Sequence, residues 1–564
     1  MRDNIKKLIF IFIALLLKSF SFSQVSISPD DEFYIDVTGW LLKGIIYYVP
    51  QTKPYPVNTV KSILNKVLDS DSESDVKKAE YYCSKYFGKN WKFSLKADFQ
   101  EVLRSIQDAE TVNNEKYDLN FYATGDFDFG KYIGFSYKTG LNFFNTNDDK
   151  NLLMPYGRFD SSKVIIDGFS LYNENLALTF DLNASVSFGT ERNYISLGVN
   201  KNSYGPFSDS SVTLNEQAYQ SLNVLYNYTG KYFDFVQILS ALVAKNPFEK
   251  NEYSLGKYYA FHSIRFPLFS KKLHLSYYET SIFANAFMPY YILPVPYIIM
   301  ANVSGFNENV LAGILFEWNP VNCLKFNINL NVDTLEPKSI IKLKFDSGLR
   351  TACQIGFEYS PLDSFCNLIK LDYTVATPFT YTFYDNGEVF GFRNHINMGI
   401  PMALNIDPNS DRISLSMNFK PKNNFTVKTL TSFIRHGNPF ESLSSEEVLS
   451  LNSKKYLSDG SQNASDGELE TFCDYTNFLT QKSLLFVIQG YIDFEYAFYI
   501  TKNQNLSFCC SYFFEFIKND GVNNNIFTGR ETTKEQVEES LNIWKENFKE
   551  RYNHYFSVGV KYTF

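Results

Sequence analysis

The sequence has little of what several common classes of protein require. Among its 564 residues, 53 Lys and Arg stand against 61 Asp and Glu, a formal charge of -8, so the chain has no basic excess with which to bind nucleic acid. It has 7 cysteines, an odd number without any C-x-x-C spacing, which favours neither a disulfide framework nor a zinc site. Past residue 24, only the stretch 284–301 approaches the ~20 apolar residues of a membrane helix, and Pro289, Pro294 and Pro296 interrupt it. A nucleic-acid-binding protein and a bundle of membrane helices are therefore disfavoured.

Aromatic side chains, in contrast, are abundant. They make up 17% of the chain, with 54 Phe and 40 Tyr but only 4 Trp, while the mean hydropathy is a mildly polar -0.22. A long chain that is rich in aromatic rings yet polar on average is typical of a transmembrane β-barrel, which has an apolar outer band and a polar lumen. The composition thus indicates an all-β transmembrane protein.

The first residues have the pattern of a secretory signal peptide. Arg2, Lys6 and Lys7 precede an apolar run over residues 8–17, and small residues follow. We predict that residues 1–23 are a signal peptide that is removed, and the alternative is an uncleaved amphipathic anchor. Because no cysteine lies near the cleavage point, a lipoprotein anchor is disfavoured.

Alternation of apolar and polar residues with a period of two repeats along most of the chain after Trp91. It is most regular at the C-terminus, where the apolar residues are Phe556, Val558, Val560, Tyr562 and Phe564. This period predicts strands with one apolar face, which a soluble antiparallel sheet would also show. We count about 18 candidate strands, however, against the roughly seven to nine of an ordinary soluble sandwich.

So many strands favour closure, because open sheet edges aggregate and leave unpaired backbone groups in lipid. We therefore predict a closed antiparallel outer-membrane β-barrel of about 18 strands over residues 91–564. Lys, Asp and Asn would line its lumen, and Phe, Tyr, Leu and Val would face the lipid.

Residues 24–90 depart from the strand pattern and have a helical period. Asn58 or Thr59 would cap a first helix, and Ser74 would cap a second helix that stops at Gly88. Because these helices precede the first strand, we expect a periplasmic segment. It would either pack against the mouth of the barrel or form a simple solubilising hairpin.

Two further stretches read as long extracellular loops, near residues 441–470 and 521–549. The second contains a helical pattern with a possible capping box formed by Thr533 and Gln536. Long loops outside and short turns inside are the asymmetry expected of outer-membrane barrels.

No catalytic motif is present. The sequence contains neither a G-x-S-x-G elbow, an H-E-x-x-H pair, a Walker loop nor a dinucleotide fingerprint, so we expect no enzyme activity, no cofactor and no metal site. His262 and Arg265 lie three residues apart on one predicted strand, and hence on opposite faces of the sheet.

Several short motifs along residues 34–420 resemble those of the Wzi-type capsule-assembly proteins of the bacterial outer membrane. After the strand at 195–199, Tyr204-Gly205-Pro206 resembles the Trp-Gly-Pro-Gly turn of that family, with Phe207 where the last Gly would stand. The family's order of a His/Arg strand, a Glu-ended strand, a Pro-rich loop and a return strand is matched by His262 with Arg265, Glu279, Pro294 and Asn309.

Two more motifs follow. Asp333 resembles the first of the family's paired aspartates, although Thr334 replaces the second. The stretch from His395 to Met402 is similar to the family's His-x-Gly-x-Pro-Leu-Gly motif, with Ala403 in place of the last Gly.

The resemblance implies an 18-stranded barrel with periplasmic helices that binds capsular or other surface polysaccharide without catalysis. The ligand-binding residues carried over from the motifs are Tyr204, Arg265, Glu279, Asp333 and His395. The departures at Phe207, Thr334 and Ala403 affect this glycan-binding role more than they affect the fold.

These observations lead to three hypotheses for a protein of the bacterial outer membrane. The first is a non-enzymatic barrel that binds or organises surface polysaccharide. The second is a porin or channel for small solutes, whose polar inner rows would line an aqueous path. The third is an adhesin that uses the long loops. The expected partners are outer-membrane lipid, surface polysaccharide and the barrel-assembly machinery, which would recognise the C-terminal strand ending in Phe564.

Overall fold

The computed structural model describes residues 27–564 with internal gaps. The gaps are residues 89–90, 129–131, 147–153, 208–210, 246–251, 270–271, 285–286, 304–307, 336–340, 342–348, 363, 384–392, 439, 442–443, 451–477, 502–503, 525–526 and 528–530. The predicted signal peptide and most of the predicted loop at 441–470 therefore lie outside the described residues.

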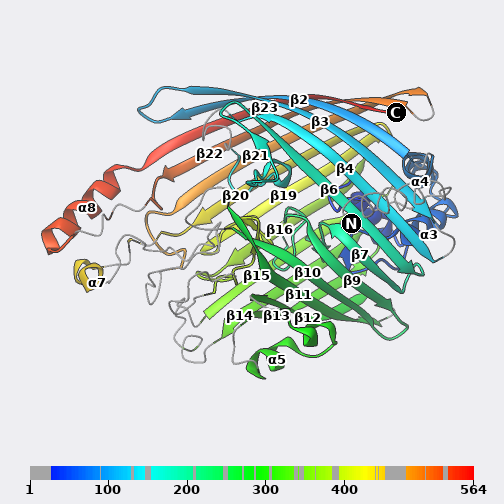
Figure 1. Cartoon of the computed structure of the whole chain (residues 1–564), viewed down its shortest axis with the longest axis horizontal. Helices are drawn as coiled ribbons and strands as arrows, with labels where there is room; N and C mark the ends of the chain where they lie inside the picture. Colours follow the sequence, from blue (N-terminus) through cyan, green and yellow to red (C-terminus); the bar gives the residue numbers. More distant parts are fainter. Residues whose placement is uncertain are drawn as a thin grey trace, which may run out of the picture.

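Within the described residues, 18 long antiparallel strands form one closed barrel, which confirms the predicted fold class (Figure 1). The strands are β2 (Trp91–Ile106), β3 (Val112–Asp128), β4 (Ile133–Asn145), β6 (Leu176–Gly189), β7 (Tyr194–Asn200), β9 (Ser221–Thr229), β10 (Asp234–Lys245), β11 (Tyr253–Leu268), β12 (Leu273–Ala284), β13 (Asn309–Val321), β14 (Leu324–Leu335), β15 (Leu349–Tyr359), β16 (Cys366–Ala376), β19 (Ser410–Lys422), β20 (Phe425–His436), β21 (Leu485–Thr501), β22 (Gln504–Asp520) and β23 (Lys549–Thr563). Short strands β1 (Thr52–Lys53), β5 (Leu171–Tyr172), β8 (Ser203–Tyr204), β17 (Ile396–Asn397) and β18 (Ile400–Pro401) complete the β-structure.

The first and last long strands close the barrel. β2 pairs with β23 from Ser94 opposite Thr563 to Ile106 opposite Arg551. The main chain of Phe564 extends this pairing, because its N–H and carbonyl both bond to Phe93. The closed sheet therefore has no free edge here, as a strand structure in lipid requires.

Strand β14 illustrates how the two faces of the wall differ. Its apolar residues Phe326, Ile328 and Leu330 point outward and are 37–43% exposed, whereas Asn327, Asn329 and Asn331 point inward and are at most 1% exposed. This is the reverse of a soluble protein, and it is the arrangement expected of a barrel in lipid.

The two ends of the barrel are unlike each other. Short turns such as 322–323 and 423–424 lie at the end that also holds the N-terminal helices and Phe564, which we call the termini end. Long connections such as 377–409 and 521–548 lie at the opposite end, which we call the loop end (Figure 1). The loop end carries α7 (Ser445–Ser450) and α8 (Lys534–Glu546), and the predicted capping box of Thr533 and Gln536 is present in α8.

In the described part of the N-terminal segment, residues 27–88, three helices are present, where the sequence pattern predicted two. They are α2 (Phe33–Leu42), α3 (Val57–Leu68) and α4 (Glu73–Phe87), and they share a buried core. The predicted caps were wrong in detail. Ser72 rather than Ser74 caps α4, and α3 follows Pro56 without a side-chain cap. Proline suits a helix start because it has no N–H to satisfy and its ring fixes φ.

The N-terminal segment packs against the inner wall of the barrel instead of standing apart from it. Asp36 on α2 is 3.1 Å from the ammonium of Lys420 on β19, and it accepts a 3.0 Å hydrogen bond from the Asn367 amide on β16. Lys78 on α4 donates to the same Asn367 at 2.6 Å. These buried polar contacts fasten the helices to the wall. Among the helices of the described residues, none combines the length and the apolar character needed to span a membrane.

We expect Asp36→Ala to release the N-terminal segment from the wall. The change leaves the buried Lys420 without its nearest carboxylate, which costs about 3–5 kcal/mol for a buried pair. The helical circular-dichroism signal should melt at a lower temperature than in the wild type, while the strand signal persists. Glu73→Ala, which removes an exposed partner of Lys77, is the control and should leave the melt unchanged. Identical melts for Asp36→Ala and the wild type would contradict this anchoring role.

Candidate functional site

Residues 154–166, between β4 and β6, reach the inner wall, where the N–H of Tyr156 donates to Glu515 at 2.7 Å. Two further connections from the loop end fold inward and fill the middle of the barrel. One comprises residues 201–207 and 211–220, and the other comprises 377–383 and 393–409. They bond to each other, because the N–H of Asn215 donates to the carbonyl of Met402 at 2.7 Å. Strand β8 of the first connection pairs with β1 of the N-terminal segment, with Tyr204 opposite Thr52. Chain from the loop end therefore meets chain from the termini end inside the lumen.

Tyr204, the first residue carried over from the motifs, lies deep in this interior. Its hydroxyl is 3.0 Å from the Ser263 hydroxyl, and its ring centroid lies 4.8 Å from that of Phe261 and 5.4 Å from that of Tyr278. Only 1% of the residue is exposed. Its side chain holds the inward connection against β11 and β12.

Phe207, which departs from the motif, has a structural partner on the wall. A Cβ atom added to Gly356 on β15 would lie 2.3 Å from Cε1 of the Phe207 ring. The ring therefore occupies a notch that only glycine provides. A glycine at position 207 would leave this notch unfilled.

Arg265 fastens the N-terminal segment to the opposite part of the wall. Its guanidinium donates to Asp234 at 2.7 and 2.9 Å and to the carbonyl of Val49 at 3.1 Å. Arg265 therefore links the N-terminal segment, through Val49, to Asp234 at the start of β10 by three hydrogen bonds within this chain.

Asp333 and His395 are brought together through Tyr381 on the second inward connection. Asp333 accepts a 2.9 Å hydrogen bond from the N–H of Tyr381, and the carbonyl of Tyr381 accepts one of 3.1 Å from the N–H of His395. The Tyr381 hydroxyl donates to the carbonyl of Val212 at 2.7 Å, which ties the two connections to each other. Burial, with a further contribution from nearby Lys257, lowers the pKa of His395 to about 3, so its ring is neutral.

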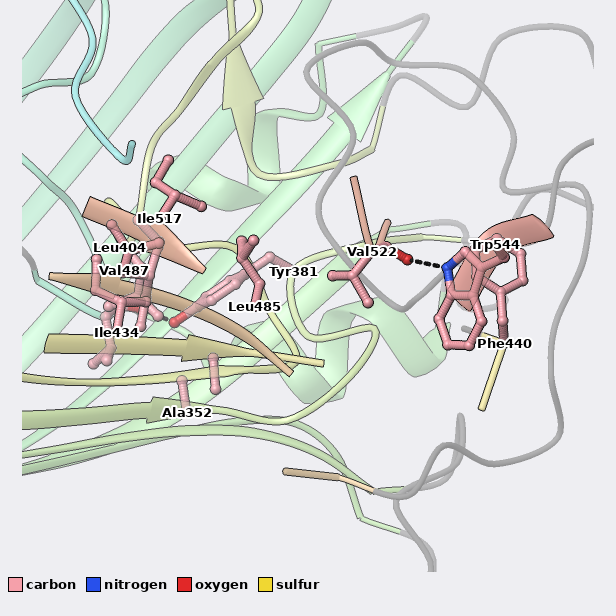
Figure 2. Packing of buried hydrophobic residues seen from close by; sticks show 14 of the residues in the cluster. Ala352, Tyr381, Leu404, Ile434, Phe440, Leu485, Val487, Ile517, Val522 and Trp544 are labelled. Carbon is pink, nitrogen blue, oxygen red and sulfur yellow. Dashed lines mark hydrogen bonds between the residues drawn. The ribbon is translucent and has the colours of Figure 1, made fainter. Parts of the chain in front are cut away.

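Figure 2 shows Tyr381 within the large apolar cluster near the loop end, beside Leu404 and Ile434. In the same cluster, the indole N–H of Trp544 on α8 donates to the carbonyl of Val522 at 2.8 Å. Packing of this kind holds α8 close to the barrel rim.

Glu279 lies on the outward face of β12, not in the lumen. Its carboxylate is 3.1 Å from Nε2 of His262, and it accepts hydrogen bonds from the hydroxyl of Tyr277 and the N–H of Tyr297. Together with Arg265 on the inward face, this confirms that His262 and Arg265 lie on opposite sides of the wall.

A folded-back segment covers this outward carboxylate. It includes η4 (Pro289–Ile292) and α5 (Tyr297–Val303), and Figure 1 shows α5 beside β12 and β13. Ile298 and Ile299 on α5 are exposed. The Glu279 side chain is thereby almost completely buried although it points away from the lumen.

The five residues carried over from the motifs thus do not form one site. Each is occupied by contacts within the chain: Tyr204, Asp333 and His395 hold the inward connections, Arg265 holds the N-terminal segment, and Glu279 holds the outer segment. Their role in ligand binding remains a prediction.

The sequence reasoning missed a polar cavity of about 350 Å³ at the termini end, between the N-terminal segment and the wall. Its lining includes Lys92, Lys138 and Lys561, which are far apart in the sequence. The alternation along each strand predicts which side chains face the lumen. It does not predict which of these side chains lie close to one another. Among the described residues, no group of three or more His, Cys, Asp or Glu side chains is placed to hold a metal ion.

Comparison with solved structures finds proteins with a similar fold. The chain is similar to Wzi of Escherichia coli, described as an outer-membrane protein involved in group 1 capsule assembly and a carbohydrate-binding β-barrel. The TM-score is 0.50 and the identity 10%, over 94% of this chain and 98% of Wzi. Two other similar structures are OccAB2 of Acinetobacter baumannii (TM-score 0.40, 9% identity, 84% of this chain and 98% of that one) and OprD of Pseudomonas aeruginosa (0.38, 10%, 84% and 95%).

No protein-family model matches the chain, and no curated protein matches it by sequence. The similarity to Wzi confirms the predicted resemblance at the level of the fold. With the apolar outer face of the wall, this fold identifies the chain as a bacterial outer-membrane barrel.

We expect the N-terminal segment to dock less firmly in acid. Glu32 lies 3.2 Å from the Lys85 ammonium and 3.5 Å from that of Lys420. Burial alone would raise the pKa of this carboxyl, but the two ammonium groups hold it well below its ordinary value of 4.5. Because the folded pKa is lowered, the stabilisation is complete above pH 4.5 and is lost as the pH falls through the lowered pKa.

The measurement is the melting temperature of the helical signal as a function of pH. It should be constant near neutrality and fall below pH 4.5, and Glu32→Gln should make that acid-side fall shallower. Parallel curves for the two proteins would show that Glu32 does not couple docking to pH.

Proposed function

We propose that the protein is a non-enzymatic outer-membrane barrel that binds or organises surface polysaccharide at its loop end. The observation that carries this proposal is the filled lumen. The N-terminal segment and two inward connections occupy the interior and bond to one another, an arrangement that suits a fixed binding surface better than a passage. The similarity in fold to a carbohydrate-binding barrel supports the same function.

The orientation of the barrel in the outer membrane follows from the difference between its termini end and its loop end. In outer-membrane barrels, short turns face the periplasm and long loops face the exterior. By this rule the termini end is periplasmic, as is Phe564 at the end of β23. In this proposal the barrel-assembly machinery recognises the C-terminal strand from the periplasmic side.

The loop end offers groups that suit a polysaccharide. In the connection between β4 and β6, Phe169 and Tyr172 are exposed, and the Tyr172 hydroxyl donates to Asp167 at 2.6 Å. Aromatic rings give flat apolar surfaces against which sugar rings pack, and carboxylates accept hydrogen bonds from sugar hydroxyls. The buried residues Tyr204, Arg265, Glu279, Asp333 and His395 act in this proposal as positioning residues, because they hold the framework from which the loops project.

Deleting the protein should release polysaccharide from the cell surface into the medium. A Phe169→Ala/Tyr172→Ala double variant should restore less surface-bound polysaccharide than the wild-type chain, because it lacks both exposed rings. Tyr232→Ala, which removes an exposed ring at the termini end, is the matched control and should restore the wild-type level. Polysaccharide is quantified in cell-bound and released fractions, with barrel assembly checked by heat-modifiable gel mobility. Wild-type retention in the deletion strain would rule out this function.

The alternative of a porin or channel is favoured only by the polar inner wall. We expect the purified protein to show no steady conductance in planar lipid bilayers, because chain segments fill the lumen. Asp36→Ala, which loosens one of these segments, should give transient openings. A large steady conductance of the wild-type protein would contradict the filled lumen and favour the channel.

A further inference from the structure

The cavity at the termini end concentrates positive charge in an otherwise acidic protein. Its lining contains five lysines against two carboxylates, although the whole chain has a formal charge of -8. The lysines are Lys85, Lys92, Lys138, Lys201 and Lys561, and the carboxylates are Asp31 and Glu495. The cavity volume, about 350 Å³, lies within the range of small-molecule sites.

Some of this charge is balanced locally. Lys85 lies 3.3 Å from Asp31 and 3.2 Å from Glu32, and Lys138 lies 3.6 Å from Asp181. Lys92 donates to the main-chain carbonyls of Lys85 and Tyr86.

Lys201 and Lys561 are different. Neither forms an ion pair with another described residue, and both contribute to the cavity lining. Lys561 shares the cavity with two other lysines, Lys85 and Lys138, and with the two carboxylates Glu495 and Asp31. Asp30 interacts with Lys201 electrostatically without forming an ion pair with it. Two ammonium groups that form no ion pair in one cavity favour an anionic ligand.

The remainder of the lining suits a polyhydroxylated ligand. Asn183, Gln504 and Asn505 provide amides, Glu495 provides an acceptor, and Tyr499 provides an exposed aromatic ring. Hydroxyl groups of a sugar both donate and accept, so they pair with amides and carboxylates alike.

The geometry points to this cavity as a binding site for an acidic saccharide, one or two units of a hexuronate-containing glycan. Lys201 and Lys561 hold the carboxylate, Glu495 and the amides hold the hydroxyls, and Tyr499 packs against a sugar ring. This inference rests on the proposed function, and it adds a second site on the opposite end of the barrel from the loops. The protein would then contact its glycan from the periplasmic side as well.

The test is isothermal titration of the full-length protein in detergent with tetragalacturonate, with neutral maltotetraose as a second probe. The wild-type protein should bind tetragalacturonate and bind it less tightly as salt increases. Lys201→Gln and Lys561→Gln should each weaken binding by about tenfold or more, since each removes a charge-assisted hydrogen bond. Lys561→Arg should retain binding, and Lys534→Gln, which changes an exposed lysine on α8, is the matched control.

Three results would overturn the inference: equal affinity for maltotetraose, unchanged affinity in both glutamine variants, or displacement of tetragalacturonate by an equal concentration of inorganic phosphate. Displacement by phosphate would show that the cavity is a general anion site.

Experiments in cells distinguish the two sites. If the loop end binds polysaccharide and the cavity does not, cells with the glutamine variants retain as much surface polysaccharide as the wild type. If the loop end fails, the Phe169→Ala/Tyr172→Ala variant retains polysaccharide normally while purified protein still binds tetragalacturonate.

Discussion

Closure of the sheet between β2 and β23 is the constraint on which the rest of the structure depends. In hydrocarbon no water is present to satisfy backbone groups, so every strand needs two neighbours, and only a closed sheet provides them. Closure also fixes the chemistry of the faces, because alternate residues must face lipid and lumen. The inward rows are then free to carry Asn, Lys and Asp, which the outward rows are not.

A polar inner wall in turn decides how the lumen is filled. Hydrophobic packing contributes little where the wall presents amides and charged groups. Specific polar contacts therefore hold the N-terminal segment and the inward connections in the lumen. Asp36 with Lys420, Arg265 with Asp234 and the Val49 carbonyl, and Asp333 with Tyr381 are contacts of this kind. Such contacts depend on geometry more than on buried area, and they hold the N-terminal segment and the inward connections in defined positions.

The sequence was sufficient to predict the barrel, since period two is a local property that every strand repeats. The last strand shows it clearly, with Phe556 and Val558 exposed on the outer face and Asn553 buried on the inner one. The capping box at Thr533 was equally predictable, because its two residues lie within one turn. Helix α2 was missed because it is buried on most sides within the lumen and so has no amphipathic pattern to detect.

The roles of single residues could not be predicted for a different reason. Tyr204 meets Ser263, Phe207 meets Gly356, and Lys201 shares a cavity with Lys561, and in each case the partner is distant in the sequence. Which loops fold inward depends on such distant partners and not on local composition. The motif that contains Glu279 likewise gave no sign that this carboxylate points outward.

That outward carboxylate has a consequence for biogenesis. Glu279 and His262 lie on the side of the wall that faces acyl chains, and an uncovered carboxylate and imidazole there would be strongly unfavourable. The hairpin of β11 and β12 therefore cannot enter the bilayer as two naked strands. Residues 288–303, which cover it, must therefore fold over the hairpin before or during its insertion, so that the folding of this outer segment is coupled to the insertion of β11 and β12.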